Sequence, residues 1–209
     1  MTSAEVQLSP RAARTRAALL AAGFDLLAMR PIDAIAIDDI VARAGVAKGS
    51  FFNHFVDKAG FATELGAQVR KELELRVTAA NQQVTDPVAR LAGGMRVALD
   101  FALNEQKRTI VMLRGLELST GLGLHLNRGV HADMEAAVAA GLARPEARRS
   151  GVPFWLGLCQ ILLLGAIERE LPRAYAAERL REMLVLGLTG LGVPQDHAVK
   201  TAAQVAGEL

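Results

Sequence analysis

The sequence has little cysteine and few aromatic residues, and its charges nearly cancel. Cys159 is the only cysteine among 209 residues, so no disulfide can form within the chain, as is typical of a reducing cytosol. Residues 1–10 lack the charged start and apolar run of a signal peptide, so we expect a cytoplasmic protein. The formal charge is only +2, and total charge therefore gives no argument for nucleic acid as a partner.

A sequence long and apolar enough to span a membrane is also lacking. The uncharged stretch 151–167 falls short of the roughly 20 residues that a spanning helix needs, and it contains Pro153 and Gln160. Charged residues bound it closely on both sides. We therefore interpret this stretch as a buried or partner-facing helix and expect no membrane partner.

The pattern of apolar residues predicts an all-α fold. β-branched residues are sparse, and no sustained alternation of period two occurs. Ser9 and Pro10 favour a helix start, Leu19, Ala22, Leu26 and Met29 form one apolar stripe, and Pro31 ends the helix. A helix that starts after Asp57 as N-cap is predicted to run past residue 73. Further helices are predicted over 38–44, 48–55, 87–104, 106–119, 127–143, 151–170, 174–191 and 196–207. Loops are predicted over 119–129 and 142–151.

Two short helices joined at Gly45 indicate a helix-turn-helix, whose second helix covers about 48–55. On a helical wheel, Phe51 and Phe55 face the core, and Asn53 points directly away. Gly49 and Ser50 flank Asn53, while Phe52 and His54 lie at the two edges. An Asn side chain can bond the N6/N7 edge of adenine, and Ser can bond either kind of base edge. This face therefore suits the major groove of DNA.

Four basic residues lie at the ends of these helices, where they can neutralise DNA phosphates. They are Arg14, Arg16, Lys48 and Lys58. A small domain that merely needs a phenylalanine-rich core would explain Phe51 and Phe55, but it leaves Phe52 on an otherwise polar face.

The segment from about Thr15 to Leu65 resembles the tetracycline-repressor (TetR) family. The resemblance rests on "RAALLAAGFDLLA", "DDIVARAGVAKGSFFNHF" and "VDKAGF". It implies that residues 1–60 form a DNA-binding domain of three helices. It also implies that residues 61–209 form a helical domain for effector binding and dimerisation, and that a homodimer binds a double-stranded operator.

Three positions depart from the usual family pattern. Ala36 stands where a Thr or Ser commonly caps the second helix, Ala47 where a Ser precedes the third, and Phe52 where a tyrosine is most frequent. The three missing hydroxyls predict fewer direct bonds to phosphate.

The second domain is expected to dimerise through 151–170 and 174–191. The stripe of Leu184, Leu188 and Leu191 predicts burial against an identical partner, and Gly157, Gly165, Gly187 and Gly190 would permit close helix approach. An effector cavity would lie among helices of 87–170, and the many Leu, Val and Ala favour an apolar small molecule. Its candidate lining residues are Phe101, Met112, Glu117, His125, Trp155 and Cys159, each of which is also a plausible core or surface residue.

No catalytic or cofactor pattern stands out, so we expect neither an enzyme nor a bound cofactor. His125, His131, Asp133 and Glu135 lack the paired spacing of a zinc site, and we expect no metal. The leading interpretation is a ligand-responsive transcriptional repressor. The alternative, motivated by the missing hydroxyls, is a helical carrier or sensor of apolar molecules without DNA binding; a purely structural dimerisation module leaves the polar face of 48–55 unexplained.

Overall fold

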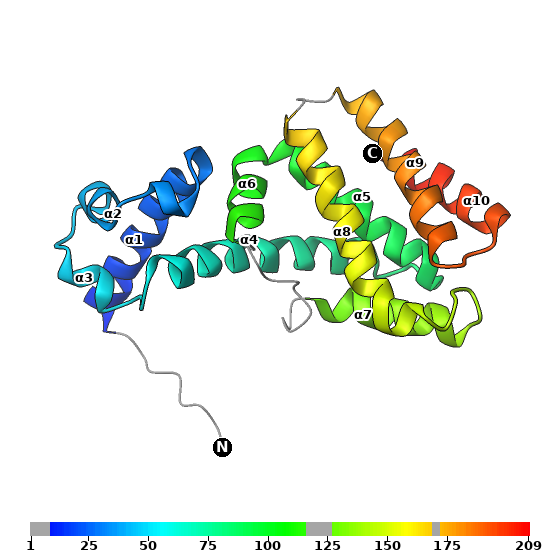
Figure 1. Ribbon diagram of the computed structural model, residues 1–209, viewed down its shortest axis with the longest axis horizontal. Helices are drawn as coiled ribbons and strands as arrows, with labels where there is room; N and C mark the ends of the chain where they lie inside the picture. The colour runs from blue at the N-terminus through cyan, green and yellow to red at the C-terminus, as the bar shows by residue number, and fades with distance from the viewer. Residues whose placement is uncertain (1–8, 116–126, 169–171) are drawn as a thin grey trace, which may run out of the picture. The chain divides into compact units, whose positions relative to one another are not determined.

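The computed structural model describes residues 9–115, 127–168 and 172–209, and within these ranges the chain is helical without a strand (Figure 1). This confirms the all-α prediction. The chain divides into two compact units. The first contains residues up to Gln68 together with a segment from Ile110, and the second contains Val69–Thr109 and the chain from Leu118 onward. Two helices, α4 (Lys58–Ala80) and α6 (Gln106–Gly115), contribute residues to both units.

The first unit begins with α1 (Pro10–Met29), which starts and ends as its local sequence predicts. The Ser9 side chain accepts a hydrogen bond from the Ala12 N–H, and Pro10 occupies the first turn. Pro31 keeps Arg30 extended, at φ −144° and ψ 153°, so the helix cannot continue. The predicted stripe is buried except for Met29, which is exposed at the end of the helix. A short 3-10 turn, η1 (Ile32–Ala34), leads to α2 (Ile37–Ala44).

Gly45 forms the turn of the helix-turn-helix. It adopts φ 67° and ψ 33°, a left-handed conformation that glycine takes without a side-chain clash. The following helix, α3, spans Gly49–Phe52 and is shorter than the predicted 48–55. Bonds from Asn53 N–H to the Gly49 carbonyl and from Phe55 N–H to the Phe51 carbonyl continue the helical path for another turn. Asp57 then accepts a bond from the Gly60 N–H and starts α4.

Three phenylalanines form the centre of the first unit. Phe51, Phe55 and Phe61 are all buried, with ring centroids 4.7–5.5 Å apart. Gly23 of α1 permits this packing, because a Cβ there would lie 2.1 Å from the Phe61 ring. The aromatic cluster fixes α3 and the start of α4 against α1 and so sets which side of α3 faces outward.

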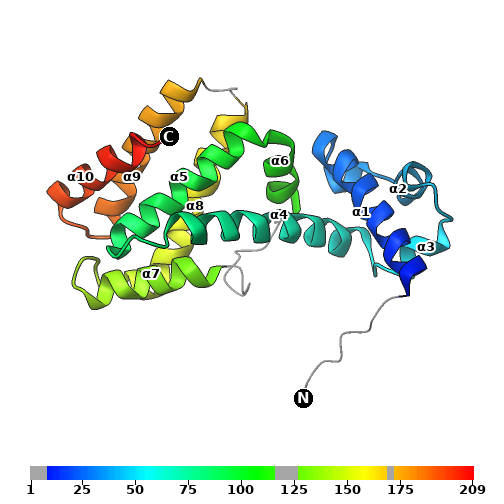
Figure 2. The same ribbon diagram turned by 180° about the vertical axis from the view of Figure 1, so that it is seen from behind.

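The second unit is a helical bundle built around α5 (Pro87–Asn104). This helix packs against α7 (Arg128–Ala139), α8 (Ala147–Glu168), α9 (Arg173–Gly190) and α10 (Gln195–Ala206) (Figure 2). Asp86 caps α5 by accepting the Val88 N–H, and its second carboxylate oxygen lies 2.8 Å from His197 of α10. The prediction of a loop over 142–151 is wrong from Ala147 onward, because α8 begins there. Pro153 lies inside this helix.

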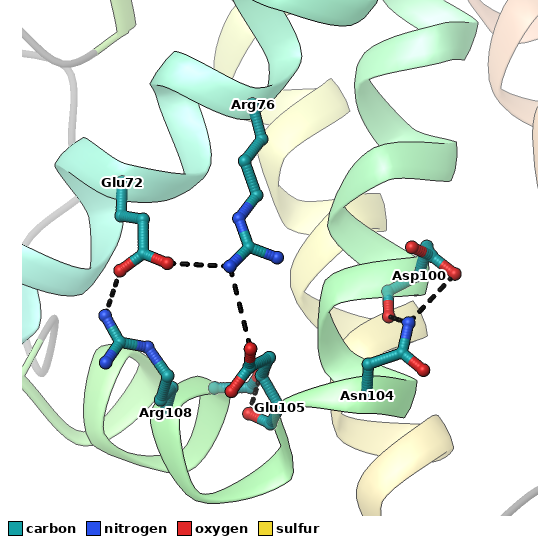
Figure 3. Close-up of polar contacts among 7 residues, drawn as sticks. Glu72, Arg76, Asp100, Asn104, Glu105 and Arg108 are labelled. Carbon is teal, nitrogen blue, oxygen red and sulfur yellow. Dashed lines mark hydrogen bonds and ion pairs between the residues drawn. The ribbon is translucent and has the colours of Figure 1, made fainter.

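A charged network links α4 to the end of α5 and the start of α6 within the second unit (Figure 3). Glu72 pairs with both Arg76, at 2.7 Å, and Arg108. The Arg76 guanidinium also lies 4.8 Å from the centre of the buried Phe101 ring and 3.6 Å from Glu105. These contacts hold the middle of α4 on the bundle, although partly exposed pairs of this kind add little stability individually.

Candidate nucleic-acid interface

The outward face of α3 carries the residues that the helical wheel placed there. Gly49, Phe52 and Asn53 are exposed, while Ser50 and His54 are partly buried at its sides. Phe51 and Phe55, on the opposite side, are 0% and 6% exposed. The face is thus made of small residues, one amide and one exposed phenylalanine ring, and it can approach the base edges of a major groove.

Of the four basic residues predicted to meet phosphates, three contact groups outside their own helix. Arg16 pairs with Glu64 and lies over the Phe55 ring, and Lys48 pairs with Asp38 at 2.9 Å. Lys58 donates from its Nζ to the carbonyls of Ile32 and Ile35, at 3.3 and 2.9 Å. Arg14 is exposed, and its Nε donates to the Pro10 carbonyl within α1. A phosphate must therefore compete with protein groups for most of these cations.

Lys58 has a structural role that the sequence alone did not reveal. Its ammonium group joins the start of α4 to both ends of η1, a turn more than twenty residues earlier in the chain. Arg114 of α6 acts similarly within the same unit, donating to the Leu27 carbonyl near the end of α1 at 2.5 Å. No local sequence pattern marks the carbonyls that Lys58 and Arg114 contact, because every residue has a backbone carbonyl that can accept a hydrogen bond.

The first departure from the family pattern leaves the N-cap of α2 without a side-chain hydrogen bond, as predicted. Ala36 occupies that N-cap, and no side chain caps the helix. Ala47 and Phe52 are both exposed beside α3 and bring no hydroxyl to this surface. Direct bonds to phosphate must therefore come from other groups.

A second exposed face lies on α8 and α9 of the other unit. The predicted leucine stripe is wrong as a partner surface: Leu184 and Leu188 are fully buried, and Leu191 is 4% exposed, all within the bundle. The exposed apolar residues lie elsewhere on these two helices. They are Phe154, Ile161, Tyr175 and Leu186. Two of them, Ile161 and Tyr175, line a groove of about 740 Å³ together with Leu162, Leu164, Gly165, Glu168, Pro172, Arg179 and Met183.

The glycines of α8 and α9 divide between the inside and the outside of the bundle. A Cβ on Gly187 would lie 2.8 Å from Leu158 and 3.0 Å from Trp155, so Gly187 serves packing within the chain. A Cβ on Gly157 or Gly165 would meet no heavy atom within 4 Å. These two positions leave room for a close approach from outside.

Helix α8 is also long and apolar enough to cross a membrane, judged by length and composition alone. One third of the window that passes this test is buried inside the chain, and helices in the cores of water-soluble proteins pass the same test.

The predicted effector residues are not all brought together. Phe101 and Trp155 are buried in the second unit, and Cys159 lies on α8 nearby, partly buried. Met112 belongs to the first unit, and Glu117 and His125 lie outside the described residues. Burial raises the pKa of the Cys159 thiol to about 12, so the thiol stays protonated at neutral pH, as its apolar surroundings predicted.

The second unit holds a polar cluster on α4 that the sequence did not reveal. Arg70 pairs with Glu74 at 2.9 Å and donates to the Oδ1 of Asn127, a buried side chain, at 2.6 Å. Burial raises the pKa of Glu74, and the attraction of Arg70 opposes this rise. This cluster places charged and amide groups beside an otherwise apolar interior.

Two of the four residues considered for a metal site have other partners. Asp133 lies 2.6 Å from Arg90, and Glu135 lies 3.2 Å from Arg148. Burial raises the pKa of Asp133, against the opposing hydrogen bond from Arg90. Across the described ranges, no three His, Cys, Asp or Glu residues gather in a way that could hold a metal ion.

Several solved structures share the fold of this chain. RolR in complex with resorcinol is similar with a TM-score of 0.64 and 18% identity, over 93% of this chain and 95% of that one. CprB, a TetR-family protein from S. coelicolor A3(2), has a TM-score of 0.55 and 21% identity, over 95% and 100%. FadR from Bacillus subtilis in complex with stearoyl-CoA has a TM-score of 0.62 and 14% identity, over 80% and 96%. No curated protein sequence gives a match.

The fold and the α3 surface define a helix-turn-helix protein with a separate helical C-terminal unit. Residues 19–65 match the family described as bacterial regulatory proteins, tetR family. The N-terminal domain therefore matches the TetR family over these residues, and the chain as a whole has the fold of solved TetR-family proteins.

Proposed function

We propose that this protein is a ligand-responsive transcriptional repressor that binds a palindromic DNA operator as a homodimer. Residues 1–60 are the DNA-binding domain, and residues 61–209 are the effector-binding and dimerisation domain. The dimer holds its two α3 helices about one DNA turn apart, roughly 34–36 Å, and so blocks access to a promoter.

The observation that carries this proposal is the exposed Asn53 amide on a face otherwise made of Gly49, Ser50 and the Phe52 ring. In a helix-turn-helix, the second helix enters the major groove with its first residues at the base edges. An amide there can bond adenine through two hydrogen bonds, while the glycine lets the backbone approach closely. His54, at the side of α3, and Arg14 and Lys48 at nearby helix ends are proposed to contact phosphates.

Arg16 and Lys58 are proposed to act on DNA mainly by positioning the domain. Their ion pair and backbone hydrogen bonds already use the charges that a phosphate would need. We therefore expect fewer phosphate contacts than four basic residues would suggest, and a modest dependence of affinity on salt.

Dimerisation is proposed through the exposed face of α8 and α9. Ile161, Tyr175 and Leu186 are each more than 60% exposed, and Gly157 and Gly165 are open to close helix approach. Apolar surface on two adjacent helices is covered most simply by the same surface of a second copy, related by a two-fold axis.

The effector is proposed to bind inside the second unit and to be largely apolar. The bundle interior is built from Leu, Ala, Met, Phe101 and Trp155, with the Arg70–Glu74–Asn127 cluster as its polar part. RolR binds resorcinol and FadR binds stearoyl-CoA in structures of this fold. An effector of this protein shifts the equilibrium between two states by its difference in affinity for them.

The test is DNA binding over a salt series, using duplexes from the region beside the protein's own gene. Asn53→Ala should weaken binding to the preferred duplex by roughly 1–3 kcal/mol and relax sequence preference, because one base pair is no longer read. Gln82→Ala removes an exposed amide at the end of α4 and is the matched control.

Equal binding by wild type and Asn53→Ala would contradict the role of α3. Absence of any salt-dependent DNA binding, with thermal stabilisation by small apolar molecules retained, would favour a carrier or sensor instead. Two observations favour testing this carrier or sensor function: the missing hydroxyls, and the basic residues that already contact protein groups.

A further inference from the structure

Three exposed ion pairs in the first unit each join a basic residue of the helix-turn-helix region to a carboxylate on a different element. They are Arg30–Asp39, Arg43–Asp25 and Lys48–Asp38, with nitrogen–oxygen distances of 2.6, 2.7 and 2.9 Å. Exposed pairs of this kind add little to the stability of a fold. Their main consequence is electrostatic, because cations that this unit could offer to DNA are already paired with anions of the same chain.

The pair of Lys48 and Asp38 lies at the edge of the α3 face. Lys48 is the N-cap of α3 and directly precedes the exposed Gly49. Asp38 lies in the first turn of α2 and reaches across to the Lys48 ammonium group. The two side chains are 60% and 68% exposed, more than those of the other two pairs. A phosphate that approaches the start of α3 therefore meets Lys48 with a carboxylate already beside it.

The Asp38 carboxylate and a DNA phosphate would bind the same ammonium group in the same way, through a charged oxygen. If Lys48 contacted both at once, the two anions would lie well within the Debye length of ~8 Å at physiological salt and would repel each other. If Lys48 instead left Asp38, the ion pair would be lost. In either case the carboxylate reduces what Lys48 contributes to DNA binding. The helix dipole of α2 does not depend on it alone, because Asp39 lies in the same first turn.

We propose that Asp38 is an autoinhibitory residue of the DNA-binding domain, whose carboxylate competes with DNA phosphate for Lys48. It holds the affinity for every DNA sequence below the value that the same surface would reach without it. This inference rests on the proposed DNA binding and adds to it an internal limit on affinity. Such a limit suits a protein released by an effector, because the binding of one ligand typically changes the affinity for another by only about 5–150-fold.

The experiment removes the charge of Asp38 and keeps the size of its side chain. Full-length protein selects a preferred duplex from a random-sequence pool, and affinity for this duplex and for an unrelated one of equal length is measured over a salt series. Asp38→Asn should strengthen binding to both duplexes about fivefold, because each half-site loses a competitor of the strength of an exposed ion pair. The gain should be equal on both, since phosphate contacts carry no sequence information, and it should shrink at high salt.

Further variants assign that gain to the ion pair. Asp33→Asn removes an exposed carboxylate of η1 and is the matched control, so its affinity should stay close to that of wild type. In a Lys48→Met background, Asp38→Asn should strengthen binding less than about twofold, because no ammonium group is left to release. Asp38→Asn should also lower the melting temperature by about 1–2 °C, because the start of α2 loses a favourable charge. Tighter binding would then not come from a more stable fold.

Three results would overturn the inhibitory role of Asp38 while leaving DNA binding intact. These are an unchanged affinity in Asp38→Asn, an equal gain in Asp33→Asn, or an undiminished gain from Asp38→Asn in the Lys48→Met background. Absence of salt-dependent binding to any duplex, by wild type and Asp38→Asn alike, would instead refute the proposed function itself and the autoinhibition with it.

Discussion

The two outward faces of this protein, one on α3 and one on α8 with α9, differ in the chemistry they expose. The α3 face carries glycine, serine and an amide beside one phenylalanine, whereas the α8–α9 face carries Phe154, Ile161, Tyr175 and Leu186 and includes a groove. Both contain glycines with open space above them, Gly49 on the first and Gly157 and Gly165 on the second. At each of these positions the helix surface lacks a Cβ, which would allow close approach to the two partners proposed for the protein.

The difference lies in what surrounds those glycines. Around Gly49 the polar groups match the hydrogen-bonding edges of bases, which are specific but contribute little apolar burial. Around Gly157 and Gly165 the surface is apolar, and in the proposed dimer its burial would provide most of the free energy of association. Under the proposed function, one face serves discrimination and the other stable assembly. Four predictions test that contrast, from the largest expected effect to the smallest.

Placing a charge at the centre of the α8–α9 face should have the largest effect. Ile161→Arg should weaken the dimer by at least about 3 kcal/mol, because both copies lose a buried apolar side chain and gain a charge without a partner. Sedimentation velocity over a concentration series measures the change. Val199→Arg, which alters an exposed apolar residue on α10, should leave the dimer intact. A dimer that tolerates Ile161→Arg would rule out this face.

The inner and outer glycines should respond in opposite ways to alanine. Gly187→Ala should lower the free energy of unfolding by about 1–3 kcal/mol, because its Cβ would overlap Leu158 and Trp155. Gly157→Ala should leave the protomer as stable or more stable, yet weaken the dimer, because the added methyl lies in the path of the partner. Chemical denaturation and sedimentation together separate the two effects. Equal losses of protomer stability would contradict the division into inside and outside.

Removing the ammonium group of Lys58 should change the stability of the fold more than it changes the charge of the α3 face. Lys58→Met keeps the apolar stem but leaves two backbone carbonyls without this donor, so the free energy of unfolding should fall by about 1.5 kcal/mol. Lys71→Met, at an exposed lysine later in α4, should change it little. If Lys58→Met instead flattens the salt dependence of DNA binding by one unit at unchanged stability, Lys58 is a phosphate contact.

Lys48 should show the smallest effect on stability, together with a measurable effect on DNA binding. Its ion pair with Asp38 is well exposed, so Lys48→Met should change the free energy of unfolding by less than about 0.5 kcal/mol. The slope of log affinity against log salt should become shallower by about one unit if Lys48 exchanges Asp38 for a phosphate. An unchanged slope would show that the α3 face binds DNA without this cation.

The local features of the DNA-binding domain were predictable from the sequence because their causes are local. Ser9 and Asp57 start helices through their own side chains, Pro31 ends one by steric exclusion, and Gly45 turns the chain by its left-handed conformation. Phe51 and Phe55 recur with helical spacing, so the direction of Asn53 followed from helix geometry alone. These are relations between residues a few positions apart.

The partners of the charged and apolar side chains were decided only by the tertiary structure. Lys58 contacts carbonyls of Ile32 and Ile35, and Arg16 contacts Glu64, across separations that no local pattern marks. Helix α9 has apolar residues on two sides, and periodicity could not tell that Leu184 and Leu188 face their own bundle while Leu186 faces outward. The sequence determined which helices form and which residues share a face. Packing against segments distant in the chain determined which of those faces remain exposed for a partner.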